Sequence, residues 1–248
     1  MIKSPLISVI TVTYNASGVI DRTLQSVANQ EFQDYEHLII DGASSDNTLK
    51  QVANFKNDKI RIISEPDKGL YDAMNKGLKE ASGDYVIFLN AGDKFHNTHT
   101  LSLYARGSDK DMDIIYGDTV VVNNEGNMIS KRHLNAPESL SFKSFSKGML
   151  ICHQAFMVKR SLAPLYNLNY RFSADFDWCI RCIKKTQPSG CMNLHCATID
   201  YLSDGLSDKN KFKSLKERFR IMSRHYGFLP TALRHLGFIY RALRRGKL

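Results

Sequence analysis

The first half of the chain alternates between short apolar runs and longer segments in which apolar residues recur every three or four positions. The apolar runs are rich in β-branched residues and predict strands at Ile7–Thr13, His37–Ile40, Ile60–Ile63 and Tyr85–Leu89. The segments between these runs predict helices at Val19–Gln30, Asp46–Phe55 and Tyr71–Ala81. Because strands that alternate with helices of this length form βαβ units, we expect an α/β fold around a parallel sheet.

The second half of the chain, from about residue 112, has a different pattern of short strands joined by turns. MDIIYGDTVVV and NMISKRH predict a hairpin around Asn124-Glu125-Gly126, and residues 133–150 predict a loop or lid. The segments that follow predict a strand at HQAFMVKR, a helix at Asp175–Lys185 and a strand at Thr198–Leu202. Two helices are expected at the end of the chain, at Phe212–His225 and Thr231–Arg245, divided by Gly227 and Pro230.

Charge is distributed unevenly along the 248 residues. The segment 209–248 contains 12 Lys and Arg residues and one acid, Glu217, whereas the first 208 residues carry 22 basic and 24 acidic residues. A near-neutral body with a strongly basic tail predicts an anionic partner for the tail. Hydrophobic residues make up 43% of the chain, which is enough for one large domain with a core. The sequence shows no signal-peptide pattern and no apolar run of 18 residues, which favours the cytoplasm.

The five cysteines have two interpretations. An odd number without an export signal favours reduced thiols. A structural zinc site would need Cys179, Cys182, Cys191 and Cys196 together with His195, but the spacing only loosely resembles paired-ligand patterns. Cys179 and Cys182 lie three apart in the helical run WCIRCIKK, so packing in the core is the preferred interpretation.

Polar side chains follow the predicted strands at the point where each strand ends. Asn15, Asp41, Asp67 and Asp93 all come just after a strand. Because ligands bind beyond the carboxyl ends of parallel strands, we expect these side chains to gather on one rim. Asp93, in FLNAGDKF, either holds a hard divalent cation that binds nucleotide phosphates or caps a helix beginning near Thr98. The other acids on the same rim favour the metal interpretation.

Further candidates lie in the turns around this rim. Asp41 can accept hydrogen bonds from a base N–H or a ribose hydroxyl, or it can stabilise an Asx-turn. The segment SEPDKGLYDAMNKG runs from a turn into a helix, and four of its residues are expected to line the nucleotide side: Asp67, Gly69, Asp72 and Asn75.

A second group of candidates lies in the other half of the chain. RFSADFDWCIR places Asp175 and Asp177 at a helix start, where carboxylates also serve as caps. Transfer to a hydroxyl needs a base, and Asp175 is the candidate for that role. Trp178 either stacks on a sugar ring or packs in the core. His153 and Gln154 follow the lid-like segment and are candidates for contact with an acceptor or a diphosphate.

Taken together, six segments resemble those of glycosyltransferase family 2, inverting enzymes with the GT-A fold: ISVITVTYN, IIDGASSDNT, SEPDKGLYDAMNKG, GDYVIFLNAGD, CHQAFMV and SADFDWCIR. They are distributed over residues 6–206. The sequences EPDKGLYDAMNKG and FLNAGDKFH most resemble those of the colanic-acid and O-antigen-type transferases of bacterial polysaccharide assembly. The resemblance implies a GT-A catalytic domain over 1–208, with a nucleotide-sugar-binding half at 1–110 and an acceptor-side half at 111–208. Residues 209–248 then form a basic helical extension.

The resemblance also implies roles on the donor side and at the metal. Tyr14 matches the aromatic residue beside the base, and Asp41 matches the acid that binds the nucleoside. Asp93 matches the last acid of the Asp-x-Asp motif that binds Mn²⁺ or Mg²⁺. The chain departs from this motif, because Asn90-Ala91-Gly92-Asp93 retains one strong carboxylate.

On the other side of the reaction, Asp175 matches the catalytic base of the family's Glu-Asp motif. The Glu that precedes this base in the family is Ala174 here, which removes a neighbour that might tune Asp175. His153 and Gln154 match the acceptor-side pair, and Asp177 and Trp178 follow the base on the same helix.

The reaction implied by the resemblance is an inverting transfer from a nucleotide-sugar, with UDP the expected nucleotide. The acceptor would be a hydroxyl of a glycan or of a polyprenyl-diphosphate-linked sugar, at the inner face of the plasma membrane. The metal would neutralise the departing diphosphate while Asp175 removes the acceptor proton.

Two other functions are alternatives. A nucleotidyltransferase usually needs a Gly-rich, basic phosphate loop, whereas TYNASGVID has one Gly and no Lys. A nucleic-acid-binding protein would suit the basic tail, but the basic residues are not interleaved with an aromatic RNA-binding motif. We therefore expect no nucleic-acid partner.

The tail itself has two interpretations. Apolar residues recur at helical spacing, at Leu229, Ala232 or Leu233, Leu236, Ile239 or Tyr240, and Leu243. Basic residues surround or follow this stripe, at Arg234, Arg241, Arg244, Arg245 and Lys247. The helix either packs on the catalytic domain with its charges in water, or lies on an anionic lipid surface as a peripheral membrane contact.

Overall fold

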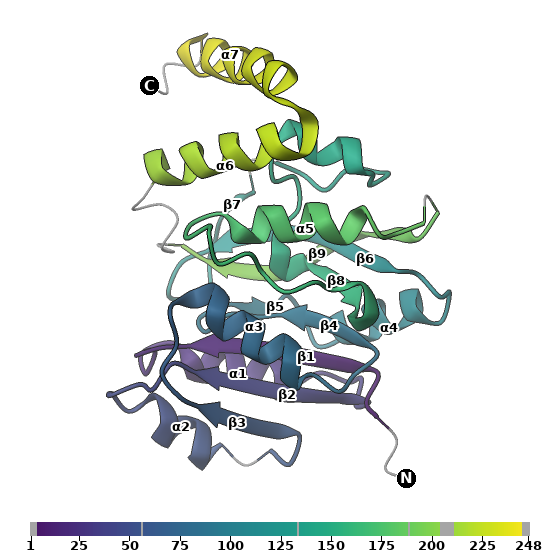
Figure 1. The fold of residues 1–248 in the computed structure, drawn as a ribbon. Helices are drawn as coiled ribbons and strands as arrows, with labels where there is room; N and C mark the ends of the chain where they lie inside the picture. Colours follow the sequence, from purple (N-terminus) through teal and green to yellow (C-terminus); the bar gives the residue numbers. More distant parts are fainter. Residues whose placement is uncertain (1–3, 56, 133, 188, 204–210, 245–248) are drawn as a thin grey trace.

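A mixed sheet runs through the molecule, with helices on both faces (Figure 1). The computed structural model describes residues 4–55, 57–132, 134–187, 189–203 and 211–244. These residues form a nine-stranded sheet with the strand order β3-β2-β1-β4-β8-β6-β9-β5, and β7 pairs with β6. The strands are β1 (Ile7–Thr13), β2 (Tyr35–Asp41), β3 (Ile60–Ser64), β4 (Tyr85–Phe88), β5 (Lys94–Phe95), β6 (Ile114–Val122), β7 (Met128–Lys131), β8 (Phe156–Lys159) and β9 (Cys191–Leu202).

The first four strands are parallel, as their pattern predicts. Thr13, Asp41 and Ser64 are register partners at the carboxyl ends of β1, β2 and β3. The loops that carry Asn15 and Asp67, and the turn that carries Asp93 after β4, therefore begin at the same edge of the sheet. The prediction of a common rim is confirmed.

The second half of the sheet is mixed. β8 runs antiparallel to β4 and β6, whereas β6 and β9 are parallel. The strand predicted at HQAFMVKR is shorter than expected, because its first residues form a 3₁₀ turn, η2 (His153–Ala155), before β8 begins. Two further 3₁₀ turns flank this region, η1 (Phe142–Lys147) and η3 (Arg160–Leu162).

The helices are α1 (Ile20–Ala28), α2 (Thr48–Asn54), α3 (Leu70–Glu80), α4 (Thr100–Ser108), α5 (Ala174–Ile183), α6 (Lys211–Tyr226) and α7 (Phe228–Arg244). α3 lies so close to the sheet that a Cβ on its Gly77 would overlap Ile10 of β1. Trp178 of α5 meets Phe88 of β4 with a ring-centroid distance of 5.7 Å. Since Ile10 and Phe88 are register partners on adjacent strands, α3 and α5 cover the same face of the sheet.

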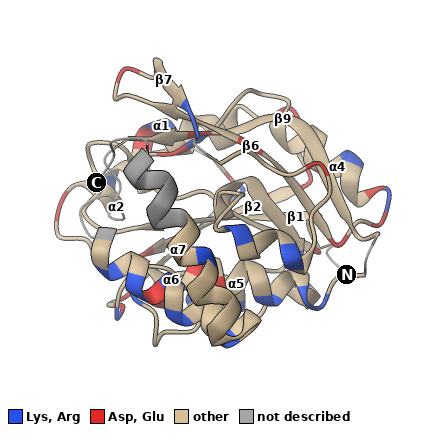
Figure 2. Cartoon of the chain, turned by 90° about the horizontal axis from the view of Figure 1, so that it is seen from above, with Lys and Arg blue, Asp and Glu red and all other residues tan. Residues whose placement is uncertain are grey.

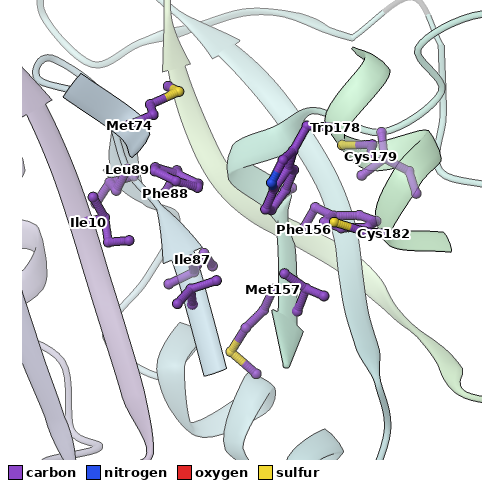
Figure 3. Close-up of a cluster of buried hydrophobic side chains, with 14 of the residues drawn as sticks. Ile10, Met74, Ile87, Phe88, Leu89, Phe156, Met157, Trp178, Cys179 and Cys182 are labelled. Atoms are coloured by element: carbon purple, nitrogen blue, oxygen red, sulfur yellow. The ribbon is translucent and has the colours of Figure 1, made fainter. Parts of the chain in front are cut away.

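The core on this face is built from large side chains of β4, β8 and α5 (Figure 3). Trp178 has no exposed surface and packs edge-on against Phe156 as well as Phe88. Cys179 and Cys182 are also fully buried there, so these two thiols pack in the core as preferred above. The apolar residues of WCIRC are therefore those that α5 buries, whereas Arg181 remains partly exposed.

The two C-terminal helices are stacked beyond α5 (Figure 1). Ile221 and Met222 of α6 are buried in the main core, so α6 packs on the catalytic body. A turn at Gly227, whose φ of 90° suits a residue without a side chain, separates α6 from α7. Among the described residues, no helix is both long and apolar enough to cross a membrane. The predicted domain boundary at 208/209 lies outside the described residues.

Candidate active site

The rim of the sheet brings together the loops that follow β1, β2 and β3. A Cβ on Gly42 would overlap the Asp67 carboxylate and would lie 3.3 Å from the Tyr14 ring, so all three residues are in close proximity. Tyr14 is 64% exposed, which leaves its ring face open to a flat ligand. Asn15 joins two of the loops, because its side-chain carbonyl accepts a hydrogen bond from the Ser45 N–H at 2.9 Å.

Asp41 lies at the centre of this rim and is fully buried. Its carboxylate accepts hydrogen bonds from the Ser44 N–H at 2.9 Å, the Ser44 hydroxyl at 2.5 Å and the Ser64 hydroxyl at 2.8 Å. Asp41 therefore holds the turn after β2 against β3, which is the Asx-turn role considered above. Its contact with a nucleoside stays a prediction.

The turn before α3 is shaped by its two acids. Asp67 accepts a hydrogen bond from the Gly69 N–H at 2.7 Å, and Asp72 accepts one from the Lys68 N–H at 2.9 Å. Gly69 has a φ of 120°, a backbone conformation that side chains rarely tolerate, so the turn depends on glycine at this position. Asp67, Gly69 and Asp72 thus form one ordered turn on the rim.

Asn75 departs from its predicted place on the nucleotide side. Its side chain is 6% exposed and pairs in both directions with the Tyr166 backbone, through its carbonyl at 2.6 Å and its amide at 3.1 Å. Both polar groups of Asn75 are therefore used to hold the 163–170 segment on α3. The sequence segment that contains both Asp72 and Asn75 did not reveal this partner of Asn75, which lies 91 residues away in the chain.

Asp93 is held by two segments that are distant in the sequence. One carboxylate oxygen accepts a hydrogen bond from the Leu202 N–H at 2.7 Å, and the other accepts one from the Gln154 amide at 2.6 Å. The side chain is nearly buried, and burial raises the pKa of Asp93 to about 6, even though these hydrogen bonds and the nearby His153 act to lower it. The carboxylate is thus fixed in position but carries a charge that its surroundings only partly compensate.

Gln154 has a structural role beside its predicted acceptor-side role. It is fully buried, and besides binding Asp93 its carbonyl accepts a hydrogen bond from the Asn90 N–H at 2.6 Å. Because both ends of its amide bind the turn after β4, Gln154 orients that turn, and its contact with an acceptor stays a prediction.

Asp175 occupies the start of α5 and faces two polar side chains. The Tyr71 hydroxyl donates a hydrogen bond to one carboxylate oxygen at 3.1 Å, and His153 Nδ1 lies 3.5 Å from the other. Burial by itself raises the pKa of Asp175, but the His153 cation and Arg218 outweigh it and hold the pKa below its ordinary value. Burial likewise acts to lower the pKa of His153, yet Asp175 and Cys152 raise it. The pair is therefore a carboxylate and an imidazolium at neutral pH.

The turn η2 connects the two acids of the site. His153 faces Asp175 while its neighbour Gln154 holds Asp93. At the strand ends and in η2, three buried polar atoms have no hydrogen-bond partner among the described residues: Thr13 Oγ1, Asn90 Oδ1 and His153 Nε2. Since buried polar groups are normally paired, these atoms are candidate contacts for a bound polar molecule.

Asp177 and Trp178 depart from their predicted acceptor-side roles. The carboxylate of Asp177 binds Arg181 at 2.6 Å and His225 of α6 at 2.7 Å, so it fastens α6 to α5. Trp178 is fully buried, and its indole N–H donates to the Pro164 carbonyl at 2.6 Å. One helical residue separates Asp175 from Asp177, so the two carboxylates point to different sides of α5.

Glu217 is a component of the site that the sequence pattern did not reveal. From α6, its carboxylate accepts hydrogen bonds from three consecutive backbone N–H groups, those of Arg171, Phe172 and Ser173, at 2.9, 2.7 and 3.0 Å. These residues directly precede the α5 turn that carries Asp175. Glu217 therefore positions the segment that carries Asp175, the predicted base. The only signal in the sequence is that Glu217 is the one acid in a basic tail.

We expect Glu217→Ala to lower kcat between about 10- and 100-fold, because three unpaired amides let the Asp175 turn shift. KM for the donor should stay near its wild-type value. Glu217→Gln keeps a carbonyl acceptor and should restore part of kcat. Steady-state kinetics of both variants, with thermal unfolding as a check on folding, tests this. Equal loss of kcat in both variants, or a change confined to KM, would contradict a positioning role.

The fold and the motifs define the class of protein. Residues 8–164 match the model of Glycosyl transferase family 2, so the chain belongs to this family. The protein is therefore a glycosyltransferase, and the prediction of this family is confirmed. The chain is similar to the crystal structure of S. aureus TarS 1–349, with a TM-score of 0.72 and 18% identity over 94% of this chain and 72% of that one. The GT-A fold expected from the sequence is thereby confirmed.

The chain is 32% identical to the PGL/p-HBAD biosynthesis glycosyltransferase of Mycobacterium bovis (strain BCG / Pasteur 1173P2), over 88% of this chain and 87% of the relative. It is 27% identical to the UDP-Glc:alpha-D-GlcNAc-diphosphoundecaprenol beta-1,3-glucosyltransferase WfgD of Escherichia coli, over 88% and 85%. The TarS 1–349 structure in complex with UDP-GlcNAc also matches, with a TM-score of 0.73 and 19% identity over 89% of this chain and 66% of that one.

Proposed function

We propose that the protein transfers a sugar from a UDP-sugar to a hydroxyl of a lipid-linked glycan acceptor, with inversion at the anomeric carbon. The observation that carries this proposal is the pair of acids joined by η2, Asp93 on the donor side and Asp175 beside His153. The printed names of two similar proteins support the choice of substrates, since WfgD uses UDP-Glc and a diphosphoundecaprenol-linked acceptor and TarS binds UDP-GlcNAc.

The donor nucleoside would bind at the rim formed by the first three strands. The exposed Tyr14 ring offers a stacking surface for the base, next to Gly42, where a side chain would block the approach. The Asp67 carboxylate lies beside this surface, and Asp41 directly precedes Gly42 in the same turn, so these two acids would accept hydrogen bonds from the base and the ribose. The diphosphate would then extend along the edge toward Asp93.

A divalent metal fits the turn after β4 in part. The Asp93 carboxylate and the unpaired Asn90 Oδ1 are hard oxygen donors of the kind that Mg²⁺ and Mn²⁺ prefer. We propose that these two residues hold the cation, which when bound neutralises charge on the departing diphosphate. No group of three or more His, Cys, Asp and Glu side chains suitable for a metal occurs in the described part of the chain. Diphosphate oxygens would therefore have to complete the coordination.

Asp175 would act as the base. Its low pKa keeps the carboxylate ionised at neutral pH, and the Tyr71 hydroxyl fixes the orientation of one oxygen. The acceptor hydroxyl loses its proton to Asp175 as its oxygen attacks the anomeric carbon. The other ring nitrogen of His153, Nε2, is unpaired and buried, so it is available to donate a hydrogen bond to the leaving diphosphate.

The donor can be identified by thermal unfolding in the presence of Mn²⁺ and a panel of UDP-, GDP- and dTDP-sugars. A UDP-sugar should raise Tm in a concentration-dependent way, because it binds the folded state alone. NMR of the product should then show the anomeric configuration opposite to that of the donor. Protection by none of the nucleotide-sugars would contradict the donor assignment, and retained configuration would contradict the displacement by an acceptor activated at Asp175.

We also propose that the reaction takes place at the inner face of the plasma membrane, where a cytoplasmic enzyme would meet a lipid-linked acceptor. The basic residues of the segment 209–248 support this location. We propose in addition that the catalytic unit extends through α6 to Gly227, since Glu217 and His225 of α6 hold α5.

A further inference from the structure

The apolar stripe of α7 faces away from the protein. Leu229, Leu233 and Leu236 are 68%, 62% and 63% exposed. At 100° per residue these three positions lie on one side of the helix. A helix that only completed the core would bury this stripe, so the packing interpretation considered from the sequence does not account for it.

The contact of α7 with the rest of the molecule uses another side of the helix. Thr231 is fully buried, and the rings of His235 and Phe228 pack edge-on against Phe219 of α6, with centroid distances of 4.9 and 5.8 Å. α7 thus rests on α6 through these three residues and is the outermost layer of the molecule (Figure 1). The side chains from residue 238 onward, and the residues Arg245 and Lys247, lie outside the described part.

Positive charge accompanies the exposed stripe. Lys213, Lys216, Arg220 and Arg224 are exposed on α6, the helix on which α7 packs (Figure 2). The segment 209–248 has one acid, and the carboxylate of that acid, Glu217, is already bound to three backbone amides. Its negative charge is therefore turned inward, and the outer surface of the two helices is basic.

We propose that the exposed face of α7, defined by Leu229, Leu233 and Leu236, inserts into the surface of an anionic lipid bilayer. Apolar side chains on one face of a helix with basic residues beside them are typical of helices that lie in the membrane interface. A second copy of the chain is a poorer occupant, because it would bring the same positive charge against this surface. The inference rests on the proposed function, because a lipid-linked acceptor is the reason for membrane contact. Lipid binding by α7 itself requires neither the donor nor catalysis.

The test is co-sedimentation of the full chain with vesicles of phosphatidylcholine alone or mixed with phosphatidylglycerol. We expect binding to the anionic vesicles that weakens as salt is raised, because salt screens the attraction of the basic residues. The double variant Leu233→Ser/Leu236→Ser should reduce binding about tenfold or more, since two apolar anchors are lost. Thermal protection by the UDP-sugar should be unchanged in this variant.

A matched control is Ile129→Ser, which removes an apolar side chain of similar exposure, 58%, from β7. It should bind anionic vesicles like the wild type. Equal binding by the double variant, or no binding by the full chain at low salt, would overturn the proposal. A dimer in sedimentation that the double variant converts to a monomer, without vesicle binding, would assign the face to a second copy instead. Failure of the donor screen alone would leave this test unaffected.

Discussion

Asp175→Asn is expected to lower kcat by roughly 10²–10⁴-fold, the usual range for loss of a general base, while donor affinity stays near its wild-type value. The substitution preserves the size of the side chain, and its carbonyl can still accept the Tyr71 hydrogen bond. An amide cannot take a proton from the acceptor hydroxyl, so the chemical step alone is affected. Single-turnover kinetics and UDP titration measure the two quantities separately.

The matched control is Asp177→Asn, two residues further along the same helix. Its carboxylate binds Arg181 and His225, so the change should lower the temperature of unfolding by loosening α6 and leave kcat much less affected. The reverse pattern, with near-normal turnover in Asp175→Asn and loss in Asp177→Asn, would transfer the role of base to Asp177.

Asp93→Asn is expected to weaken the metal-dependent part of UDP affinity by roughly 100-fold or more, since even indirect partners of a metal typically contribute 10–100-fold. No second carboxylate in the turn Asn90–Asp93 can replace it. Calorimetry with UDP, with Mn²⁺ and with EDTA, separates the metal-dependent affinity from the rest. Affinity without metal should change little.

Asp200→Asn provides the comparison for this result, because Asp200 is also nearly buried but pairs with Lys94 at 3.1 Å and His96 at 2.5 Å. We expect it to keep the metal-dependent affinity. If Asp93→Asn bound UDP and Mn²⁺ as tightly as the wild type does, Asp93 would have a structural role only, as the anchor of Leu202 and Gln154.

The strand and helix order of the first half could be predicted because β1, β2 and β4 are largely apolar and almost entirely buried, and the edge strand β3, although half exposed, keeps three isoleucines in five residues. The parallel order then places the strand ends on one edge, so the rim of Asp41, Asp67 and Asp93 follows from the pattern. The short strand β5 and the start of β9 could not be predicted in the same way, because neither is an uninterrupted apolar run.

Several residues have structural roles that the sequence did not reveal, because their partners lie far along the chain. Asn75 pairs with Tyr166, Gln154 with Asp93, and Glu217 with residues before α5. A motif shows which residues are neighbours in the sequence. The role of a polar side chain, however, depends on the group with which it forms a hydrogen bond in the folded protein. Trp178 lies in the core for a different reason. The α5 face that carries it is buried against the sheet, so its ring has no exposed surface on which a sugar could stack.

The stacking of α5, α6 and α7 has a consequence for the acceptor. Packed helices lie about 8–10 Å apart, so two such spacings separate the outer helix from the one that begins with the Asp175 turn. If α7 rests in the lipid surface, the base is held at a set height above it. The protein would then select acceptors by length. A hydroxyl that reaches this height above the lipid surface would react, whereas the hydroxyls of shorter lipid-linked sugars would not reach Asp175.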